Sequence, residues 1–217
     1  SLKGSDKITF VLPESLDTSY FGKNEHRIVK KDSFSILFIG RLIEWKAPIL
    51  AIKILEKLLK LNHNVRLDIV GSGPEYERCF NYIVENKLEA FIKLHGALSQ
   101  EGIKELFRGS DVFLFPGIKE SETLKAEAQG LVIQEAQAMG IPVIVSDAGG
   151  MKYGLIDGKT GYVVPENDID SFVEKVENLI RNPNLKAEFG ENGRQFVIEN
   201  FDSEVIGKKL LEIYAMN

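Results

Sequence analysis

Two glutamates, Glu127 and Glu135, stand eight positions apart, and their type and spacing suit the binding of hydroxyl groups. Gly130 interrupts the segment between them. Residues 131–139 read as a short helix that ends at Gly140, a residue type common just after a helix. The unpaired N–H groups and the positive dipole end at the start of such a helix suit a phosphate. The stretch therefore predicts two hydroxyl acceptors that flank an anion site, the arrangement that a sugar nucleotide requires.

Two other interpretations of the glutamate pair stay open. The two residues can be a loop carboxylate and a helix-face carboxylate that share no task, since carboxylates at this spacing are frequent. A hydrolase that uses two carboxylates is the second alternative. The position of one glutamate at a phosphate-type helix start favours hydroxyl binding over hydrolysis.

Arg41 and Lys46 follow a predicted strand at residues 35–39. Arg can pair with two phosphate oxygens at once, and Lys supplies a second positive charge. The alternative is a solvated loop pair in which Arg41 bridges to a surface carboxylate. Ligands of parallel sheets bind at the carboxyl ends of the strands, so the position of this pair favours phosphate binding.

Gly71 and Gly73 follow a second predicted strand and resemble the opening of a dinucleotide-binding fingerprint. Tyr76 occupies the place of the third glycine, and no acidic residue ends the next strand near Leu94. A tight strand-to-helix turn with Pro74 at the first helical position is therefore favoured over NAD binding. Such a turn can still border a ligand.

The histidines, His26, His63 and His95, are scattered, and their spacing indicates neither a Ser/His/Asp arrangement nor a metal site. His63 reads as a helix-end residue, and His95 is a candidate for lining a nucleobase pocket. Cys79 is the only cysteine, so a disulfide within the chain is excluded and a reducing compartment is favoured. Its helical setting indicates packing rather than a catalytic thiol.

The composition describes an acidic chain with enough apolar residues for a buried core. It has 217 residues, of which 44% are hydrophobic, and a net charge of −5. This charge argues against a general nucleic-acid binder. No apolar run approaches the roughly 20 residues that span a bilayer. The polar start has no signal-peptide core and no initiator Met, so we expect an excised piece of a cytoplasmic protein.

Short β-branched and aromatic runs alternate with amphipathic stretches of helix length. Strands are predicted at residues 35–39, 66–70, 91–94, 111–116, 141–145 and 161–164. Helices are predicted at residues 48–61, 75–85, 99–107, 131–139, 168–181, 184–200 and 203–214, with Ser99 as an N-cap. The alternation predicts a Rossmann-like three-layer α/β/α domain at residues 35–217, with a parallel sheet between two layers of helices.

The first 34 residues differ from the rest. Residues 7–12 could add a strand, and residues 13–32 read as a polar connector, so we assign residues 1–34 to an interdomain linker. Residues 117–126 form a polar loop that is long for its position and is expected to be mobile.

Several segments together resemble the carboxyl-terminal half of a retaining glycosyltransferase of the GT-B fold, family four, described as glycosyl transferases group 1. Glu127 and Glu135, with Gly130, Leu131 and Val132 between them, match the family's paired-glutamate motif. The other similar segments are the linker, the diphosphate segment, the second-strand turn, the fourth strand and the tail, at residues 11–21, 38–46, 69–75, 109–116 and 157–165.

The resemblance implies a role for each matching residue. Arg41 and Lys46 would bind the diphosphate of a UDP- or GDP-sugar, helped by the N–H groups that follow Gly130, at Leu131 and Val132. Glu135 would accept hydrogen bonds from the ribose, and Glu127 from the donor sugar as the catalytic residue. The residues expected to border the nucleobase are Gly71, Gly73, Ala97 and Leu98. The family needs neither a metal nor another cofactor at this site, so side-chain cations would balance the leaving diphosphate.

The resemblance also implies a missing partner. The acceptor site, for a glycan or a lipid-linked acceptor in polysaccharide biosynthesis, would lie on the amino-terminal domain of the same enzyme. The fragment alone would then turn over little, and the whole enzyme could be membrane-peripheral. Departures from the family pattern at residues 47–48, 128–129 and 149–153 leave the donor sugar open. A nucleotide-sugar epimerase half and a non-catalytic nucleotide-binding module remain as alternatives.

Overall fold

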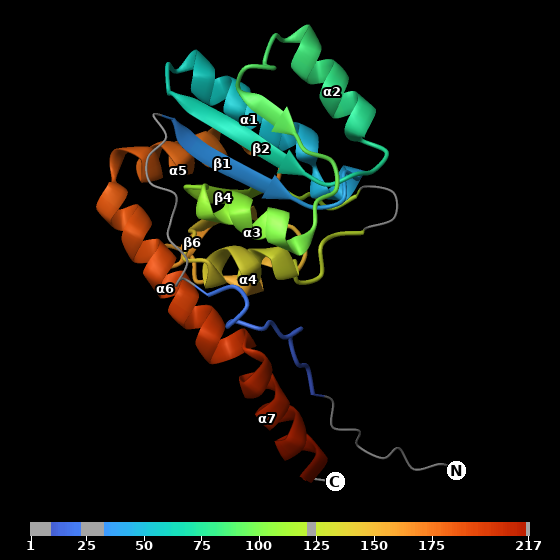
Figure 1. The fold of residues 1–217 in the computed structure, drawn as a ribbon, viewed down its shortest axis with the longest axis vertical. Helices are drawn as coiled ribbons and strands as arrows, with labels where there is room; N and C mark the ends of the chain where they lie inside the picture. The colour runs from blue at the N-terminus through green and yellow to red at the C-terminus, as the bar shows by residue number, and fades with distance from the viewer. Residues whose placement is uncertain (1–9, 23–32, 121–124, 216–217) are drawn as a thin grey trace.

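A computed structural model describes residues 10–22, 33–120 and 125–215 of the chain and shows a six-stranded parallel sheet (Figure 1). The strands lie in the order β3-β2-β1-β4-β5-β6. Their bounds are Phe34–Ile39 for β1, Val65–Val70 for β2, Ile92–Leu94 for β3, Val112–Phe115 for β4, Val143–Ser146 for β5 and Gly161–Val164 for β6. The predicted parallel α/β sheet is confirmed.

The strand order reverses at the centre of the sheet, next to β1. This strand pairs with β2 along its whole length, from Phe34 opposite Val65 to Ile39 opposite Val70, and with β4 on its other side. At such a switch point the connections leave to opposite faces, which opens a crevice beyond the carboxyl ends of the strands. The crevice of this chain is therefore expected beyond β1 and β4.

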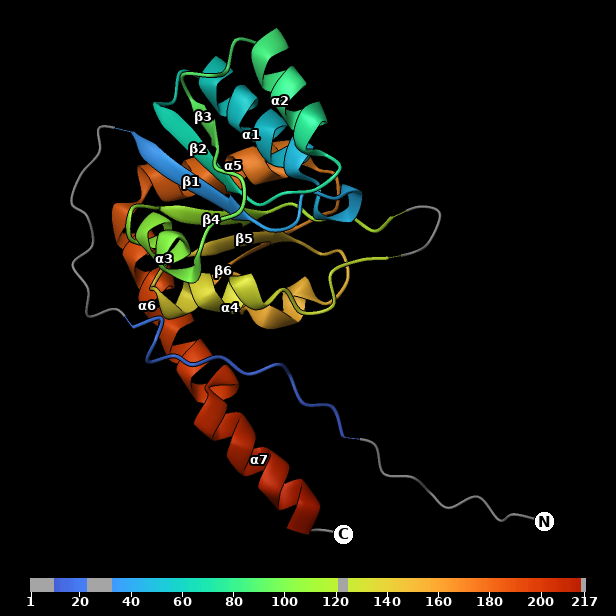
Figure 2. The ribbon, with the colours of Figure 1, turned by 45° about the vertical axis from the view of Figure 1, so that its right-hand side comes forward.

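Helices cover both faces of the sheet (Figure 2). On one face α1 packs against both α2 and α5, while α4 packs against α6 on the other face, where α3 lies beside α4. The α-helix bounds are Pro48–Lys60 for α1, Tyr76–Glu85 for α2, Gln100–Arg108 for α3, Leu131–Ala138 for α4, Ile169–Arg181 for α5, Pro183–Phe201 for α6 and Ser203–Ala215 for α7. The last helix, α7, extends away from the sheet (Figure 1).

The core is built from apolar runs that parallel strands bury on both faces. All four residues of β4 and of β5 are buried. Phenylalanine rings connect the central strands to α3. The ring centroid of Phe115 lies 5.7 Å from that of Phe38 and 5.9 Å from that of Phe113. The centroid of Phe113 in turn lies 6.3 Å from that of Phe107 in α3. This packing fixes the ends of β1 and β4 relative to each other.

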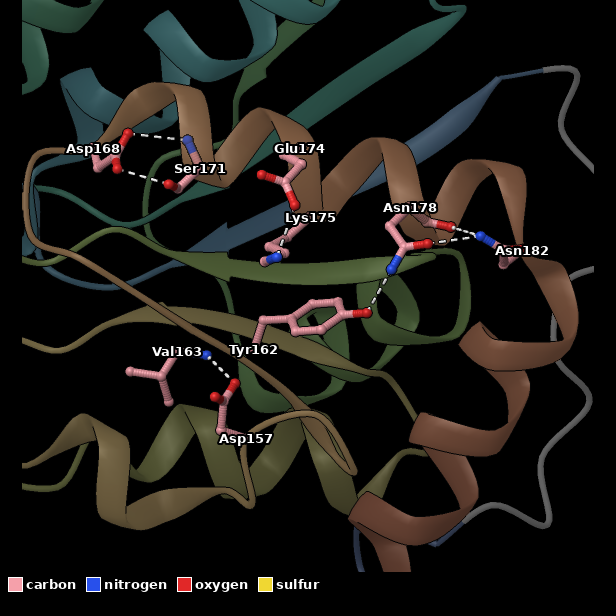
Figure 3. Close-up of polar contacts among 9 residues, drawn as sticks. All are labelled: Asp157, Tyr162, Val163, Asp168, Ser171, Glu174, Lys175, Asn178 and Asn182. Atoms are coloured by element: carbon pink, nitrogen blue, oxygen red, sulfur yellow. Dashed lines mark hydrogen bonds and ion pairs between the residues drawn. The ribbon is translucent and has the colours of Figure 1, made fainter.

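Polar contacts fasten α5 over the outer strand β6 (Figure 3). The side chain of Asp168 caps the helix by accepting a 3.0 Å hydrogen bond from the N–H of Ser171. Asn178 donates a 2.7 Å hydrogen bond to the hydroxyl of Tyr162, and the ammonium of Lys175 lies 5.3 Å from the centre of the same ring. These contacts stabilise the edge of the sheet farthest from β3.

Capping residues mark the start of α3 and the end of α4 as the sequence predicts, but the start of α2 differs. The hydroxyl of Ser99 accepts a hydrogen bond from the N–H of Gly102, which confirms the predicted N-cap of α3. Gly140 has a φ of +74° just after α4, as its position predicts. The prediction of Pro74 at the first helical position is wrong, because α2 begins at Tyr76 and Pro74 lies in the preceding turn.

Residues 10–22 lie along α4 and the junction of α6 with α7, as both ribbon views show (Figures 1 and 2). The N–H of Leu16 donates a 2.8 Å hydrogen bond to the carbonyl of Phe201, and the N–H of Ser203 donates to the carbonyl of Leu16. Leu16 and Phe21 are buried in the main core, so this part of the predicted polar connector packs on the domain.

Parts of two sequence expectations lie outside the described residues. Of the possible strand at residues 7–12, only residues 10–12 are described, and they form no strand. Residues 121–124 of the predicted long loop are likewise outside the description, so its mobility stays a prediction. The linker boundary at residue 34 also stays a prediction. Within the described ranges, no helix combines the length and the apolar character that crossing a bilayer requires.

Candidate functional site

A cavity of about 520 Å³ opens beside the carboxyl end of β1 and the start of α4. Ile39 and Gly40 at the end of β1 form one wall, and Lys46 reaches in from the loop that follows. Residues 127–132 form the wall on the side of α4, together with Glu135. The remaining wall comes from the amino-terminal segment, through Leu12 and Glu14. The cavity thus lies at the switch point of the sheet.

Lys46 supplies the positive charge of this cavity. It ends a short 3₁₀-helix, Glu44–Lys46, which turns the chain between β1 and α1. A Cβ at Gly40 would lie only 3.0 Å from the Lys46 side chain, so this glycine permits the close approach of the lysine to the strand end. The ammonium lies 5.6 Å from the ring centre of Phe115, and 3.0 Å from the carboxylate of Glu127.

The loop that carries Glu127 is held by two glycines after β5. The N–H of Gly150 donates a 2.8 Å hydrogen bond to the carbonyl of Glu127. A Cβ at Gly150 would lie 1.7 Å from the carbonyl oxygen of Ala128, and one at Gly149 would lie 2.3 Å from that of Glu127. Only glycine permits such contact, so these positions fix the backbone from which Glu127 reaches Lys46.

The amino-terminal end of α4 faces the cavity through Leu131 and Val132. Gly130 precedes the helix with a φ of +72°, a conformation that favours glycine, and no side chain caps the helix. The N–H groups of Leu131 and Val132 have no carbonyl partner within the helix, whereas that of Ile133 donates to the carbonyl of Gly130. All three lie at the positive end of the helix dipole. The cavity can therefore hold an anion between this helix end and Lys46.

Glu135 lies in the second turn of α4 and also lines the cavity. Burial raises the pKa of its carboxyl group above the ordinary value of 4.5. Two buried glutamines of the same helix contact the segment that follows β5. Gln137 donates a 2.7 Å hydrogen bond to the carbonyl of Gly154, in the short helix Met151–Gly154, and Gln134 lies against the same carbonyl at 3.5 Å. The helix is thus fixed against the segment that follows the two glycines.

The structure brings together only part of the predicted site. The residues of the prediction that line the cavity are Lys46, Glu127, Gly130, Leu131, Val132 and Glu135. Arg41 follows Gly40 directly, but it is exposed and does not line this cavity.

The residues expected near a nucleobase also lie outside the cavity lining. Gly71 and Gly73 have φ values of +137° and +155°, and a Cβ at Gly71 would lie 1.9 Å from the carbonyl oxygen of Gly40. The turn after β2 therefore packs directly on the end of β1. Ala97 and Leu98, which follow β3, are exposed on the same edge of the sheet. These four residues border the edge rather than the cavity itself.

The other candidates from the sequence have structural partners elsewhere. The ring of His95 lies 2.6 Å from the carboxylate of Asp68, in a separate groove, and does not line the cavity. His63 contacts Glu177 at 2.5 Å. Cys79 is buried, and burial raises the pKa of its thiol to about 12, which agrees with a packing role. Within the described residues, no group of His, Cys, Asp and Glu side chains could hold a metal ion.

The sequence does not predict the part played by the amino-terminal segment. Leu12 and Glu14 carry no pattern that would place them at a site, yet both line the cavity. Gln129 also lines it and makes two hydrogen bonds to the backbone of Glu14. The only sequence signal for this contact is that residues 128–129 depart from the pattern that the paired-glutamate motif usually has.

Comparison with known proteins gives one family for most of the chain. The model of the family described as glycosyl transferases group 1 matches residues 23–196. A GDP-mannose-dependent phosphatidylinositol monomannoside mannosyltransferase of Mycolicibacterium smegmatis is 27% identical over 94% of this chain and 55% of its own length. The capsular polysaccharide biosynthesis glycosyltransferase CapM of Staphylococcus aureus is 28% identical over 92% of this chain and 50% of its own length. The chain therefore spans about half the length of these curated relatives.

Solved structures share the fold. The Anabaena protein HepE in complex with UDP superposes with a TM-score of 0.83, at 19% identity, over 99% of this chain and 59% of HepE. The carboxyl-terminal domain of a group 1 glycosyl transferase from Francisella tularensis gives a TM-score of 0.74, at 22% identity, over 87% of this chain and 99% of that domain. The second match covers a single domain almost completely.

Proposed function

Since the chain belongs to the glycosyl transferases group 1 family, we propose that it is the donor-binding part of an enzyme that transfers a sugar from a nucleotide sugar to an acceptor. The observation that carries this proposal is the cavity in which Lys46, the start of α4 and the two glutamates meet. A cation and a helix amino terminus suit a diphosphate, and carboxylates suit the hydroxyl groups on either side of it. HepE in complex with UDP supports a nucleoside diphosphate as the ligand class.

Each group in the cavity has a proposed role. The ammonium of Lys46 and the N–H groups at Leu131 and Val132 bind the diphosphate. Glu135 accepts hydrogen bonds from the ribose, and Glu127 accepts them from the transferred sugar. Arg41 and the exits of β2 and β3 border the diphosphate and the nucleobase from the adjoining edge of the sheet.

The contact between Lys46 and Glu127 bears on the transfer step. When the bond between sugar and diphosphate breaks, negative charge develops on the diphosphate oxygen. In the proposed binding mode Lys46 and the amino terminus of α4 stabilise that charge, which is the contribution that fixed cations and dipoles make to a transition state. A diphosphate at this place competes with Glu127 for the ammonium, so donor binding frees the carboxylate for the sugar hydroxyls.

The acceptor site and the stereochemistry of transfer depend on residues outside this chain. We propose that the acceptor, a glycan or a lipid-linked sugar, binds the amino-terminal half that the curated relatives have in addition. The sugar is then transferred with retention of configuration in the cleft between the halves, and this chain alone turns over little. The mycobacterial relative and HepE point to GDP-mannose and UDP-sugars as the first donors to test.

Thermal denaturation with UDP, GDP, ADP and NAD tests the proposal. A ligand at 100 times its Kd adds about 2.7 kcal/mol to the free energy of unfolding, which raises the Tm of a chain of this size by about 5–10 °C. We expect one nucleoside diphosphate to stabilise the protein and NAD to leave it unchanged. Stabilisation by NAD would favour a nucleotide-sugar epimerase, and a response to none of the four would favour an interaction module.

A further inference from the structure

The side chain of Gln129 joins the loop between β4 and α4 to the amino-terminal segment, residues 10–22. Its carbonyl oxygen accepts a 2.7 Å hydrogen bond from the N–H of Glu14, and its amide nitrogen donates a 3.1 Å hydrogen bond to the carbonyl of Glu14. The carboxamide thus satisfies both backbone groups of one residue that is 115 positions away in the chain. A two-way contact of this kind fixes the position of the Glu14 backbone as well as its direction.

Little else holds this part of the segment. Further along, Leu16 is fixed by backbone hydrogen bonds with Phe201 and Ser203, at the junction of α6 and α7. In the part of the chain that the structure describes, the two bonds to Gln129 are the only hydrogen bonds of residues 10–15. Val11 is 90% exposed and Glu14 is also exposed, while Leu12 and Pro13 are half-buried. The position of the Glu14 backbone, which packing does not fix, therefore depends on Gln129.

The amino-terminal segment lies between two cavities. Leu12 and Glu14 line the donor cavity, and Leu12, Ala128 and Gln129 also line a neighbouring cavity of about 450 Å³. This second cavity continues toward Tyr153 and α6. Ala128 and Gln129, which line both cavities, directly follow Glu127 in the loop before α4.

We propose that Gln129 is a positioning residue that holds Leu12 and Glu14 as the wall against which the sugar of the donor lies. This inference rests on the proposed function, and it assigns the wall to the sugar because Glu127, the proposed sugar ligand, is two residues from Gln129. The nucleotide part of the donor lies on the other side of the diphosphate. The affinity for the sugar part therefore depends on the contact between Gln129 and Glu14, and the affinity for the free nucleotide does not.

The variant Gln129→Met tests this dependence, because methionine has a similar length and shape but lacks both hydrogen-bonding groups. Calorimetric titration compares UDP with UDP-glucose and UDP-N-acetylglucosamine, and GDP with GDP-mannose. We expect the Kd of the free nucleotide to stay within about twofold and the Kd of its sugar conjugate to rise about tenfold, the scale of two lost hydrogen bonds. Hydrogen exchange at the Glu14 amide should become faster in the same variant.

Two further variants make the test specific. Gln129→Glu keeps an acceptor for the N–H of Glu14 but repels its carbonyl, so its sugar-nucleotide affinity should lie between those of the wild type and Gln129→Met. Gln195→Met makes the same exchange at an exposed position of α6 and should match the wild type.

The outcomes separate the inference from the proposed function. Equal losses for nucleotide and sugar nucleotide in Gln129→Met, or no loss for either, would overturn the positioning role while nucleotide binding itself stands. If the wild type binds no nucleotide at all, the proposed function fails and this inference falls with it.

Discussion

At the scale of single residues, Lys46 and Glu127 form an ion pair in the cavity beside α4. Lys46 is the cation that lines the described cavity, and Glu127 holds it at 3.0 Å, with both side chains about one-fifth exposed. A pair that is only partly in contact with water is screened less by solvent than a surface pair. The two residues are therefore expected to act as one unit when a diphosphate binds.

The proposed roles of Glu127 at the sugar and Glu135 at the ribose predict a selective effect of Glu127→Ala. Removal of this carboxylate leaves the diphosphate contacts in place and frees Lys46, so the affinity for a free nucleoside diphosphate should not fall. The affinity for the sugar nucleotide should fall by about 10- to 150-fold, which corresponds to about 1.5–3 kcal/mol for hydrogen bonds to a charged group. Calorimetric titration of both ligands measures the difference. Losses of the same size for both would show that Glu127 does not serve the sugar.

The half-buried carboxyl group of Glu135 predicts a pH-dependent stability. Burial raises its pKa in the folded chain above the ordinary 4.5, so the folded state binds this proton more tightly than the unfolded state. Its contribution to stability is therefore complete below pH 4.5 and is lost as the pH rises through the raised pKa. Glu135→Gln cannot ionise and escapes this loss. Urea denaturation over a pH series should show the variant gaining stability relative to the wild type across that window, and a constant difference would contradict the assignment.

At the scale of elements, the site is made by strand ends and by close backbone contacts between loops. The loop after β1 brings Lys46, the loop after β4 brings Glu127 and the start of α4, and the turn after β5 holds that loop in place. Gly150 is the tightest of these contacts, because a Cβ there would lie 1.7 Å from a carbonyl oxygen.

A side chain at Gly150 should therefore disturb both the fold and the sugar end of the site. Gly150→Ala is expected to cost about 1–3 kcal/mol of the free energy of unfolding, the range for overpacking, and to weaken sugar-nucleotide binding more than nucleotide binding. Gly207→Ala in α7 is the matched control. A Cβ there meets no atom within 4 Å, and alanine favours a helix by about 1 kcal/mol, so this variant should be more stable than the wild type. Normal stability of Gly150→Ala in urea denaturation would contradict the close packing.

The sequence predicts the elements better than the contacts between them. Strand and helix periodicity follow from burial along one segment, so β1 to β6 and α1 to α7 appear near their predicted bounds. The approach of Lys46 to Glu127 can be predicted in the same way. The two residues follow β1 and β4, and the carboxyl ends of parallel strands share one edge of the sheet. The contact of Gln129 with Glu14 has no such local cause, because it depends on where the amino-terminal segment crosses α4. Arg41 differs again, because it follows the predicted strand β1 but does not line the cavity.

At the scale of the whole molecule, the chain spans about half the length of its curated relatives. Its six-stranded sheet carries the cavity beside the carboxyl end of β1, at the switch point of the strand order. The amino-terminal segment passes α4 before it joins the domain at α6 and α7 (Figure 2), and its Leu12 and Glu14 line the cavity. A shift of Leu12 or Glu14 would therefore change the wall of the cavity.

Calorimetric titration of UDP and GDP into the wild type and Lys46→Ala shows whether the cavity beside α4 binds the diphosphate of a nucleotide. We expect the wild type to bind at least one of the two nucleotides. The variant should bind it about 10- to 150-fold more weakly, for the loss of about 1.5–3 kcal/mol of charged hydrogen bonding. Lys53→Ala, which removes a lysine of α1 that lies over the ring of Tyr82, should bind like the wild type. Equal nucleotide affinity in all three proteins would contradict the account.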